Sequence, residues 1–202
     1  MRRFFAFLML TLFVASPAIA AIETGDVAVL ALPDHHAIRF TLITTGGYVG
    51  FDAGADWGVV EMQSRPPVMT TTFQIPDSIG GKVEATVHLL QPDTAGGQEA
   101  VAAYDRAHAS LKPENYKGWT IFTSFTYHEI SPKPTIYTVM DARATQGDVI
   151  CAVHLSWPNT SARDAGFGTD MKAAFMALLD SVQGGTGPYQ AAPGEVVRHP
   201  AN

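Results

Sequence analysis

The chain has 202 residues, 13 of them basic and 19 acidic, and a net charge of −6 at neutral pH. An acidic chain without a lysine or arginine cluster is repelled by phosphate backbones and by anionic lipid headgroups, which argues against nucleic acids and membrane surfaces as partners. The only cysteine, Cys151, rules out an intramolecular disulfide. Because apolar residues flank it, we interpret Cys151 as a small core side chain rather than a reactive thiol.

The first 20 residues have the three parts of a signal peptide. Arg2 and Arg3 precede an apolar run over residues 4–14, and Pro17 precedes small residues that end at Ala20. The run is shorter than the roughly 20 apolar residues that span a bilayer, so the pattern predicts cleavage after Ala20 and no stable membrane anchor. We therefore expect a periplasmic or secreted protein with a mature net charge of about −8.

Apolar runs bounded by turn residues predict the first strands. Segments 26–32 and 38–44 are such runs and are separated by turn residues. Segment 48–67 is interrupted by glycines and is predicted as mostly loop, with a possible strand at 57–63.

A second hairpin and a helix follow. Segments 68–75 and 83–89 alternate with period two around a turn rich in proline and glycine, which predicts an antiparallel pair. Apolar residues at helical spacing predict a helix over 99–111, before Pro113.

The last part of the chain predicts three long strands and a closing helix. The strands are expected at 119–128, 135–144 and 148–157, and the last two are joined by a short connection that contains glycine. A helix beginning at residue 162 or 169 ends at Val182, before two glycines.

These elements predict an α+β fold in which a mostly antiparallel sheet is covered by helices, as in an α/β/α sandwich. Residues 1–20 are assigned to the signal peptide and residues 21–183 to a single globular domain. Residues 184–202 lack a periodic pattern and are predicted to be a flexible tail.

The stretch from about residue 57 to 182 contains Asp56-Trp57-Gly58, the predicted mid-chain helix, Gly118-Trp119 before the long strands, and a closing Leu179-Asp180-Ser181-Val182. These features produce a resemblance to the PsbP-like family of α/β/α sandwich proteins. It implies an exported or lumenal accessory protein that binds a partner and has no catalytic centre shared across the family. No functional residue is transferred.

Histidines are the best candidates for a chemical site, because the common hydrolase, phosphate-binding and dithiol motifs are absent from the sequence. His88, His128 and His154 all lie on predicted strand faces opposite the apolar rows. If these strands are neighbours, the three imidazoles could bind Zn²⁺ or Cu²⁺, with Asp34 or Glu129 as a carboxylate partner. The alternative interpretation is that they are ordinary polar residues of a half-exposed sheet.

Other charged and aromatic residues allow two interpretations as well. Asp141 and Arg143 could serve acid–base roles, but we interpret them as surface charges near strand ends. Tyr48, Phe51 and Trp57 form an aromatic stretch between glycines that could contact a partner; alternatively, they pack against the edge of the domain.

The sequence thus supports two functional hypotheses. The first is an exported, non-enzymatic accessory or binding protein of the bacterial envelope, without a cofactor and with an envelope protein as candidate partner. An immunity protein that blocks a basic toxin would be one version. The alternative is a small periplasmic metal-binding protein or enzyme that uses the strand histidines. Convergence of these histidines, or a deep polar pocket, would favour the alternative.

Overall fold

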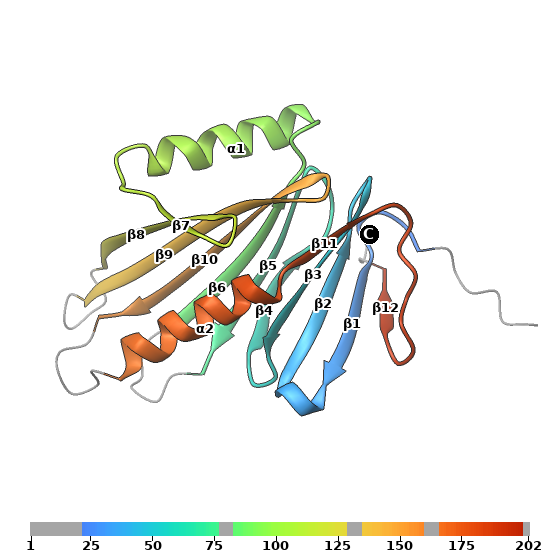
Figure 1. Cartoon of the computed structure of the whole chain (residues 1–202), viewed down its shortest axis with the longest axis horizontal. Coiled ribbons are helices and arrows are strands. Elements are labelled where there is room, and N and C mark those ends of the chain that lie inside the picture. The colour runs from blue at the N-terminus through green and yellow to red at the C-terminus, as the bar shows by residue number, and fades with distance from the viewer. Residues whose placement is uncertain (1–21, 77–82, 129–134, 160–165, 200–202) are drawn as a thin grey trace, which may run out of the picture.

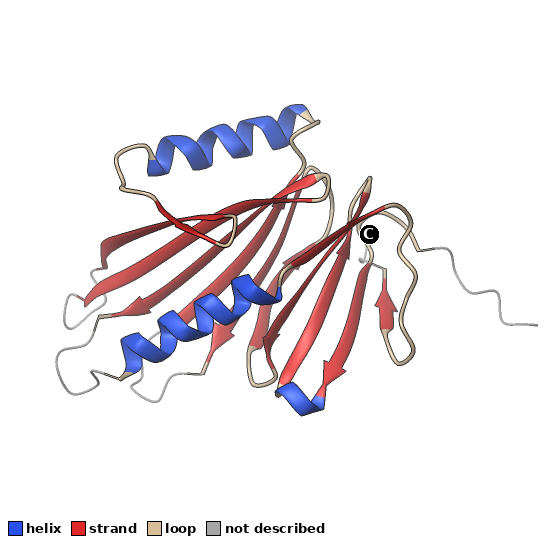
Figure 2. Ribbon diagram, viewed as in Figure 1, coloured by secondary structure: helices blue, strands red, loops and turns tan. Residues whose placement is uncertain are grey.

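The computed structural model describes residues 22–76, 83–128, 135–159 and 166–199. Of these residues 53% are in strands and 20% in helices, and the strands form two antiparallel sheets (Figure 2). The predicted class, an α+β sandwich with a helix-covered sheet, is therefore wrong. The fold is β-rich because segments predicted as loop or tail pair into a second sheet.

The larger sheet has seven strands in the order β4-β5-β6-β10-β9-β8-β7. The hairpin predicted for residues 68–89 is confirmed as β5 and β6, and the three long strands predicted after the mid-chain helix are confirmed as β8, β9 and β10. Strand bounds are β4 Gly58–Gln63, β5 Val68–Ile75, β6 Val83–Leu90, β7 Glu114–Tyr116, β8 Trp119–His128, β9 Thr135–Gln146 and β10 Val149–Pro158.

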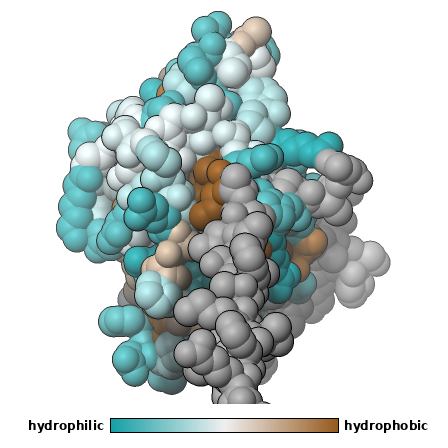
Figure 3. Space-filling view, turned by 90° about the vertical axis from the view of Figure 1, so that its right-hand side faces the viewer, coloured by the Kyte–Doolittle hydropathy of each residue, from teal (hydrophilic) through white to brown (hydrophobic). Residues whose placement is uncertain are grey.

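The smaller sheet has five strands in the order β11-β3-β2-β1-β12 and combines the two ends of the described chain. Its bounds are β1 Val27–Leu32, β2 Ala37–Ile43, β3 Gly47–Gly54, β11 Gln183–Thr186 and β12 Val196–Arg198. A short 3-10 helix, η1 (Pro33–His35), joins β1 to β2. Seen from the side on which this sheet lies, the visible surface of the described residues is mostly hydrophilic, with small apolar patches (Figure 3).

The two α-helices lie on opposite faces of the seven-stranded sheet (Figure 1). Helix α1 (Ala95–His108) begins four residues earlier than predicted, because the Thr94 hydroxyl accepts a hydrogen bond from the Gly97 amide at 3.0 Å and caps the helix. Helix α2 (Phe167–Ser181) buries Phe175, Leu178 and Leu179 in the core.

The hydrophobic core lies between the two sheets and includes α2. Phe40 of β2 and Phe51 of β3 meet Phe73 of β5, with ring centroids 5.2 and 6.1 Å from that of Phe73. Both Phe51 and Phe73 are completely buried. Residues from both sheets therefore share one core.

The second sheet was predicted only in part. Its strands β1 and β2 are confirmed at the predicted segments, whereas glycines obscure β3 and β11. Most of β3 lies in a segment predicted as loop, and the tail predicted as flexible contributes residues to β11 and β12. The possible strand at 57–63 is confirmed as β4 of the larger sheet. A Cβ atom on Gly47 would lie 1.9 Å from the Gly185 carbonyl oxygen, so the β3–β11 pairing requires glycine there. Here glycine permits close strand contact instead of marking a turn.

Some predicted features lie outside the described residues. These are the signal peptide with its cleavage site and the turn between β5 and β6. Among the helices of the described ranges, none combines the length and the apolar character that crossing a bilayer requires.

Candidate functional site

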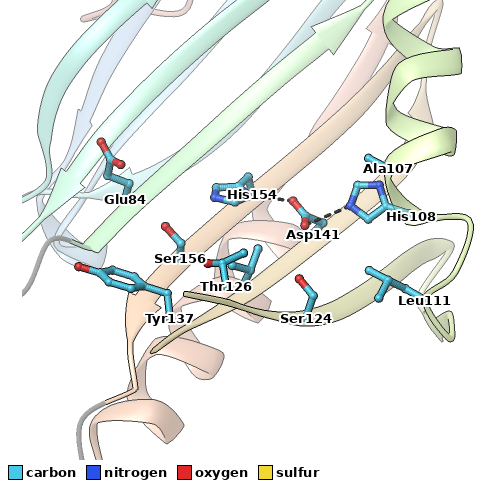
Figure 4. Close-up of a pocket in the computed structure, with 11 residues that line it drawn as sticks. Glu84, Ala107, His108, Leu111, Ser124, Thr126, Tyr137, Asp141, His154 and Ser156 are labelled. Atoms are coloured by element: carbon cyan, nitrogen blue, oxygen red, sulfur yellow. Dashed lines mark hydrogen bonds and ion pairs between the residues drawn. The ribbon is translucent and has the colours of Figure 1, made fainter. Parts of the chain in front are cut away.

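A cavity lined by both polar and apolar side chains opens on the outer face of the seven-stranded sheet, which is the face turned away from the five-stranded sheet. It has a volume of about 600 Å³ and lies beside the C-terminal end of α1. Strands β6, β8, β9 and β10 supply the outward rows of side chains that form its floor (Figure 4). Its polar lining residues are Glu84, His108, Ser124, Thr126, Tyr137, Asp141, His154 and Ser156.

Asp141 of β9 is the centre of a hydrogen-bonded group at one end of this cavity. Its Oδ1 accepts a hydrogen bond from His154 Nδ1 at 2.8 Å, and its Oδ2 lies 3.1 Å from His108 Nε2. Asp141 and His154 are direct cross-strand partners in the β9–β10 register, whereas His108 reaches the pair from the last turn of α1. Side-chain exposure is 14% for Asp141, 10% for His108 and 36% for His154.

The environment of Asp141 keeps it ionised. Burial alone would raise the pKa of its carboxyl group, but hydrogen bonds and charges from His154 and His108 outweigh burial and lower this pKa below its ordinary value. Asp141 is therefore a carboxylate at neutral pH, and it holds both imidazole rings in fixed orientations.

His108 is enclosed on several sides. Its Nδ1 lies 2.7 Å from the Tyr104 carbonyl oxygen, which accepts hydrogen bonds only, while its Nε2 faces the Asp141 carboxylate. Its ring also stacks on the Tyr104 ring, with centroids 4.1 Å apart, and packs against Phe122. The His108 ring is therefore held between the Tyr104 carbonyl group and the Asp141 carboxylate.

His154 is the more exposed imidazole of the group. Because its Nδ1–H donates to Asp141, Nε2 is the ring nitrogen that is left to interact with a bound molecule. Ser156 follows two residues later on the same face of β10 and lines the same cavity. This arrangement can accept a proton or a hydrogen bond from a bound molecule.

The structure brings two of the three predicted metal-binding histidines close together. His88 is paired with Ala152 in the β6–β10 register and is therefore a diagonal neighbour of His154. Its Nδ1 lies 3.0 Å from the Thr70 hydroxyl. Burial lowers the pKa of His88, and the nearby His154 lowers it further.

The backbone of the third histidine, His128, lies elsewhere in the sheet. His128 pairs with Thr135, six positions along β9 from Asp141, or about 20 Å at the rise of a strand. Of the predicted carboxylate partners, Asp34 lies on the exposed η1 turn, and Glu129 is outside the described residues. In the part of the chain that the structure describes, no group of three or more His, Cys, Asp or Glu side chains is placed to hold a metal ion.

The three predicted partner-binding aromatic residues pack against the protein itself. Phe51 is fully buried in the core. Tyr48 is half-buried against Tyr189, with ring centroids 4.9 Å apart, and Trp57 packs on Phe73 at 5.9 Å. Phe51 is therefore a core residue, and partner binding by Tyr48 and Trp57 stays a prediction.

The contact between His108 and Asp141 was not predicted from the sequence. Asp141 and Arg143 were interpreted as surface charges, but Asp141 is largely buried and Arg143 forms an ion pair with Asp105 of α1. His108 has helical spacing with Tyr104, a signal that places it on the packed face of the helix. Only the docking of α1 on the sheet shows that His108 meets Asp141.

Comparisons with known proteins identify no family for this chain. No protein-family model matches the sequence, and no curated protein matches it. A crystal structure of a protein from Bacteroides thetaiotaomicron has a TM-score of 0.45 and 12% sequence identity over 68% of this chain. The chain spans less than half of that protein, since the match covers 45% of it. The resemblance to the PsbP-like family stays a prediction.

Proposed function

We propose that this protein is an exported binding protein and that its cavity on the outer sheet face binds a small polar ligand. The observation that carries the proposal is a cavity of about 600 Å³ whose floor combines an anchored imidazole with several hydroxyl groups. Small-molecule sites have volumes of this order and contain a few convergent polar groups.

The polar groups of the cavity are held in place before a ligand arrives. Asp141 orients His154 through a 2.8 Å hydrogen bond, and His108 holds Asp141 from the opposite side. Because Ser124 and Ser156 are on regular strands of the same sheet, their backbones are fixed as well. A site that is already ordered loses less conformational entropy on binding, which favours affinity.

Binding can be tested by thermal shift with sets of sugars, amino acids, amines and organic acids. We expect at least one class to raise the Tm by several degrees at concentrations far above its Kd. Ser156→Leu places an apolar side chain in the cavity and should abolish this shift. Ser110→Leu, which makes the same change at an exposed position after α1, should retain it.

A second variant separates loss of binding from loss of folding. His154→Gln removes the imidazole and retains a polar side chain, so it should weaken binding while the circular dichroism spectrum stays that of the wild type. A ligand shift that is equal in wild type, Ser156→Leu and His154→Gln would show that binding occurs elsewhere and would refute the proposed site.

Acid–base catalysis is a second candidate function, favoured by the hydrogen bond between His154 and Asp141. A carboxylate that accepts from Nδ1 fixes the tautomer in which Nε2 can remove a proton from a substrate or from water. Turnover of a bound ligand, lost in His154→Gln, would support catalysis. Binding without turnover would support the first function.

A further inference from the structure

We infer that the protein has a second binding site, for a neutral sugar, where the two ends of the described chain meet. The site is a cavity of about 800 Å³, called the terminal cavity below, which is lined by the β2–β3 turn, by Ile22 and Thr24, and by residues 187–191 after β11. Its volume lies within the range of roughly 300–1,000 Å³ that is typical of small-molecule sites. It shares no lining residue with the cavity on the outer sheet face, so the inference does not depend on the proposed function.

Three segments that are far apart in the sequence are tied together around the terminal cavity. The Gly187 amide donates to the Gly46 carbonyl oxygen at 2.8 Å, which fixes the chain after β11 against the β2–β3 turn (Figure 1). The Thr24 hydroxyl donates to the Thr44 carbonyl oxygen at 3.3 Å, which adds the residues before β1. The walls are therefore held in place before a ligand binds, which reduces the entropy lost on binding.

The lining of the terminal cavity is uncharged. Among its described residues there is no lysine, arginine, histidine, aspartate or glutamate. The nearby carboxylates are occupied by the protein itself: Asp148 accepts hydrogen bonds from the Thr44 hydroxyl and the Gly46 amide, both at 2.8 Å. Glu195 accepts one from the Tyr189 hydroxyl at 2.6 Å. A charged ligand would lose hydration here without gaining an opposite charge, so a neutral ligand is favoured.

The polar groups of the lining suit hydroxyl groups. Thr45 Oγ1 accepts a hydrogen bond from Gln91 Nε2 at 2.8 Å, so the hydroxyl hydrogen of Thr45 can be donated to a ligand. Thr24 donates to a backbone carbonyl group, so its oxygen can accept, and the exposed Gln190 amide can do both. A sugar hydroxyl also donates and accepts. It therefore fits this lining better than an ammonium group, which only donates, or a carboxylate, which only accepts.

Apolar side chains complete the lining. Ile22, Ile43 and Pro188 contribute aliphatic surface, and Tyr189 contributes an aromatic ring. This ring packs edge-on against Tyr48, with centroids 4.9 Å apart, which fixes its orientation. The C–H groups of a sugar ring can pack on such a surface while the hydroxyl groups at its rim form hydrogen bonds. Apolar surface next to neutral donors and acceptors is thus the combination that a sugar requires.

Isothermal titration calorimetry with matched sugars tests the inference. The neutral set is glucose, galactose, N-acetylglucosamine, maltose and cellobiose, and the charged set is glucosamine and glucuronate. We expect at least one neutral sugar to bind with a Kd in the millimolar range or below. Both charged sugars should bind at least about tenfold more weakly than the best neutral one. Absence of binding by every neutral sugar, or equal binding by a charged one, would overturn the inference.

A pair of variants at Tyr189 separates the aromatic ring from its hydroxyl group. Tyr189→Leu removes the ring and should weaken sugar binding about tenfold. Tyr189→Phe keeps the ring and loses only the hydrogen bond to Glu195, so its Kd should stay within about threefold of the wild-type value. Equal affinities in the two variants would contradict packing of the sugar on this ring.

A second pair of variants changes the size of the cavity at exposed positions, where the fold is expected to tolerate substitution. Ala191→Leu places a larger side chain on the lining and should weaken sugar binding about tenfold. Ala192→Leu makes the same change at the next residue, which is exposed but does not line the cavity, and should change the Kd less than about twofold. Circular dichroism checks that both variants fold, and equal affinities in the two would overturn the inference.

The same measurements distinguish the terminal cavity from the cavity on the outer sheet face. Sugar binding that is lost in Ala191→Leu and retained in Ser156→Leu supports the terminal cavity, whatever the outer cavity binds. Sugar binding that is retained in Ala191→Leu and lost in Ser156→Leu would support the proposed function and refute this inference.

Discussion

The two faces of the seven-stranded sheet are built by the same strands, yet their side chains have opposite properties. On the inner face, Met69, Phe73 and Leu155 are completely buried against the five-stranded sheet and α2. On the outer face, polar side chains bond to one another across strands, as in the Thr70–His88 and His154–Asp141 contacts. Period-two alternation thus separates a dry core from a polar surface on which a site can form.

The largest expected difference between the faces is in packing energy. Phe73→Ala removes a ring that contacts Phe40, Phe51 and Trp57, and we expect it to lower the free energy of unfolding by about 3–5 kcal/mol. Thr72→Ala changes the adjacent residue on the other face and loses one 3.2 Å hydrogen bond to Thr86. Its expected cost is about 1 kcal/mol. Urea unfolding measures the loss of stability in each variant. Similar losses in Phe73→Ala and Thr72→Ala would contradict the expected difference between the two faces.

A smaller effect is expected for the polar group of the outer face. Asp141→Asn removes the charge that holds two imidazoles and should cost about 2 kcal/mol at pH 7. Because the pKa of Asp141 is lowered in the folded protein, this contribution is fully present above about pH 4 and is lost as the pH falls through the lowered pKa. Wild type and variant should therefore converge in stability under strong acid.

The control for this prediction is Asp105→Asn on α1. Asp105 pairs with Arg143, but its side chain is 49% exposed, so its loss should cost less than about 1 kcal/mol. A cost as large as that of Asp141→Asn would mean that general charge effects, and not the His108–Asp141–His154 contacts, stabilise this face.

The smallest expected effect concerns His88. Because burial lowers its pKa in the folded state, the unfolded chain binds a proton more readily. Stability should therefore fall as the pH decreases from about 6.5 toward the lowered pKa. Part of this loss should disappear in His88→Gln, as measured by urea unfolding at pH 8 and pH 5.5. The same loss in both proteins would assign the pH dependence to other groups.

Much of the seven-stranded sheet could be predicted because apolar and polar residues alternate regularly along its strands. The β5–β6 hairpin and the β8–β10 strands were predicted from this pattern within a few residues. The five-stranded sheet could not be predicted in full, because β3 and β11 are rich in glycine and pair through contacts distant in sequence. The strand propensity of a short segment does not indicate which distant segment it pairs with.

The contact between Asp141 and His154 depends on a strand register that the sequence pattern did not predict. A connection over residues 145–147 would pair Ala144 with Asp148 and would place Asp141 opposite Cys151. The observed turn at Gly147 and Asp148 instead pairs Gln146 with Val149, which places Asp141 opposite His154. Gly147 has a φ of 60°, in the left-handed region that this tight turn requires. A shift in register therefore decides which side chains meet.

The sequence by itself determined which face of each regular strand is apolar, because alternation is a property of neighbouring residues. It also placed His88 and His154 on the polar side. Only the tertiary structure decided which strands outside the predicted hairpins are neighbours, the register of the strands, and where α1 docks. These features depend on contacts between residues far apart in the chain, such as His108 and Asp141, and they alone create the cavity.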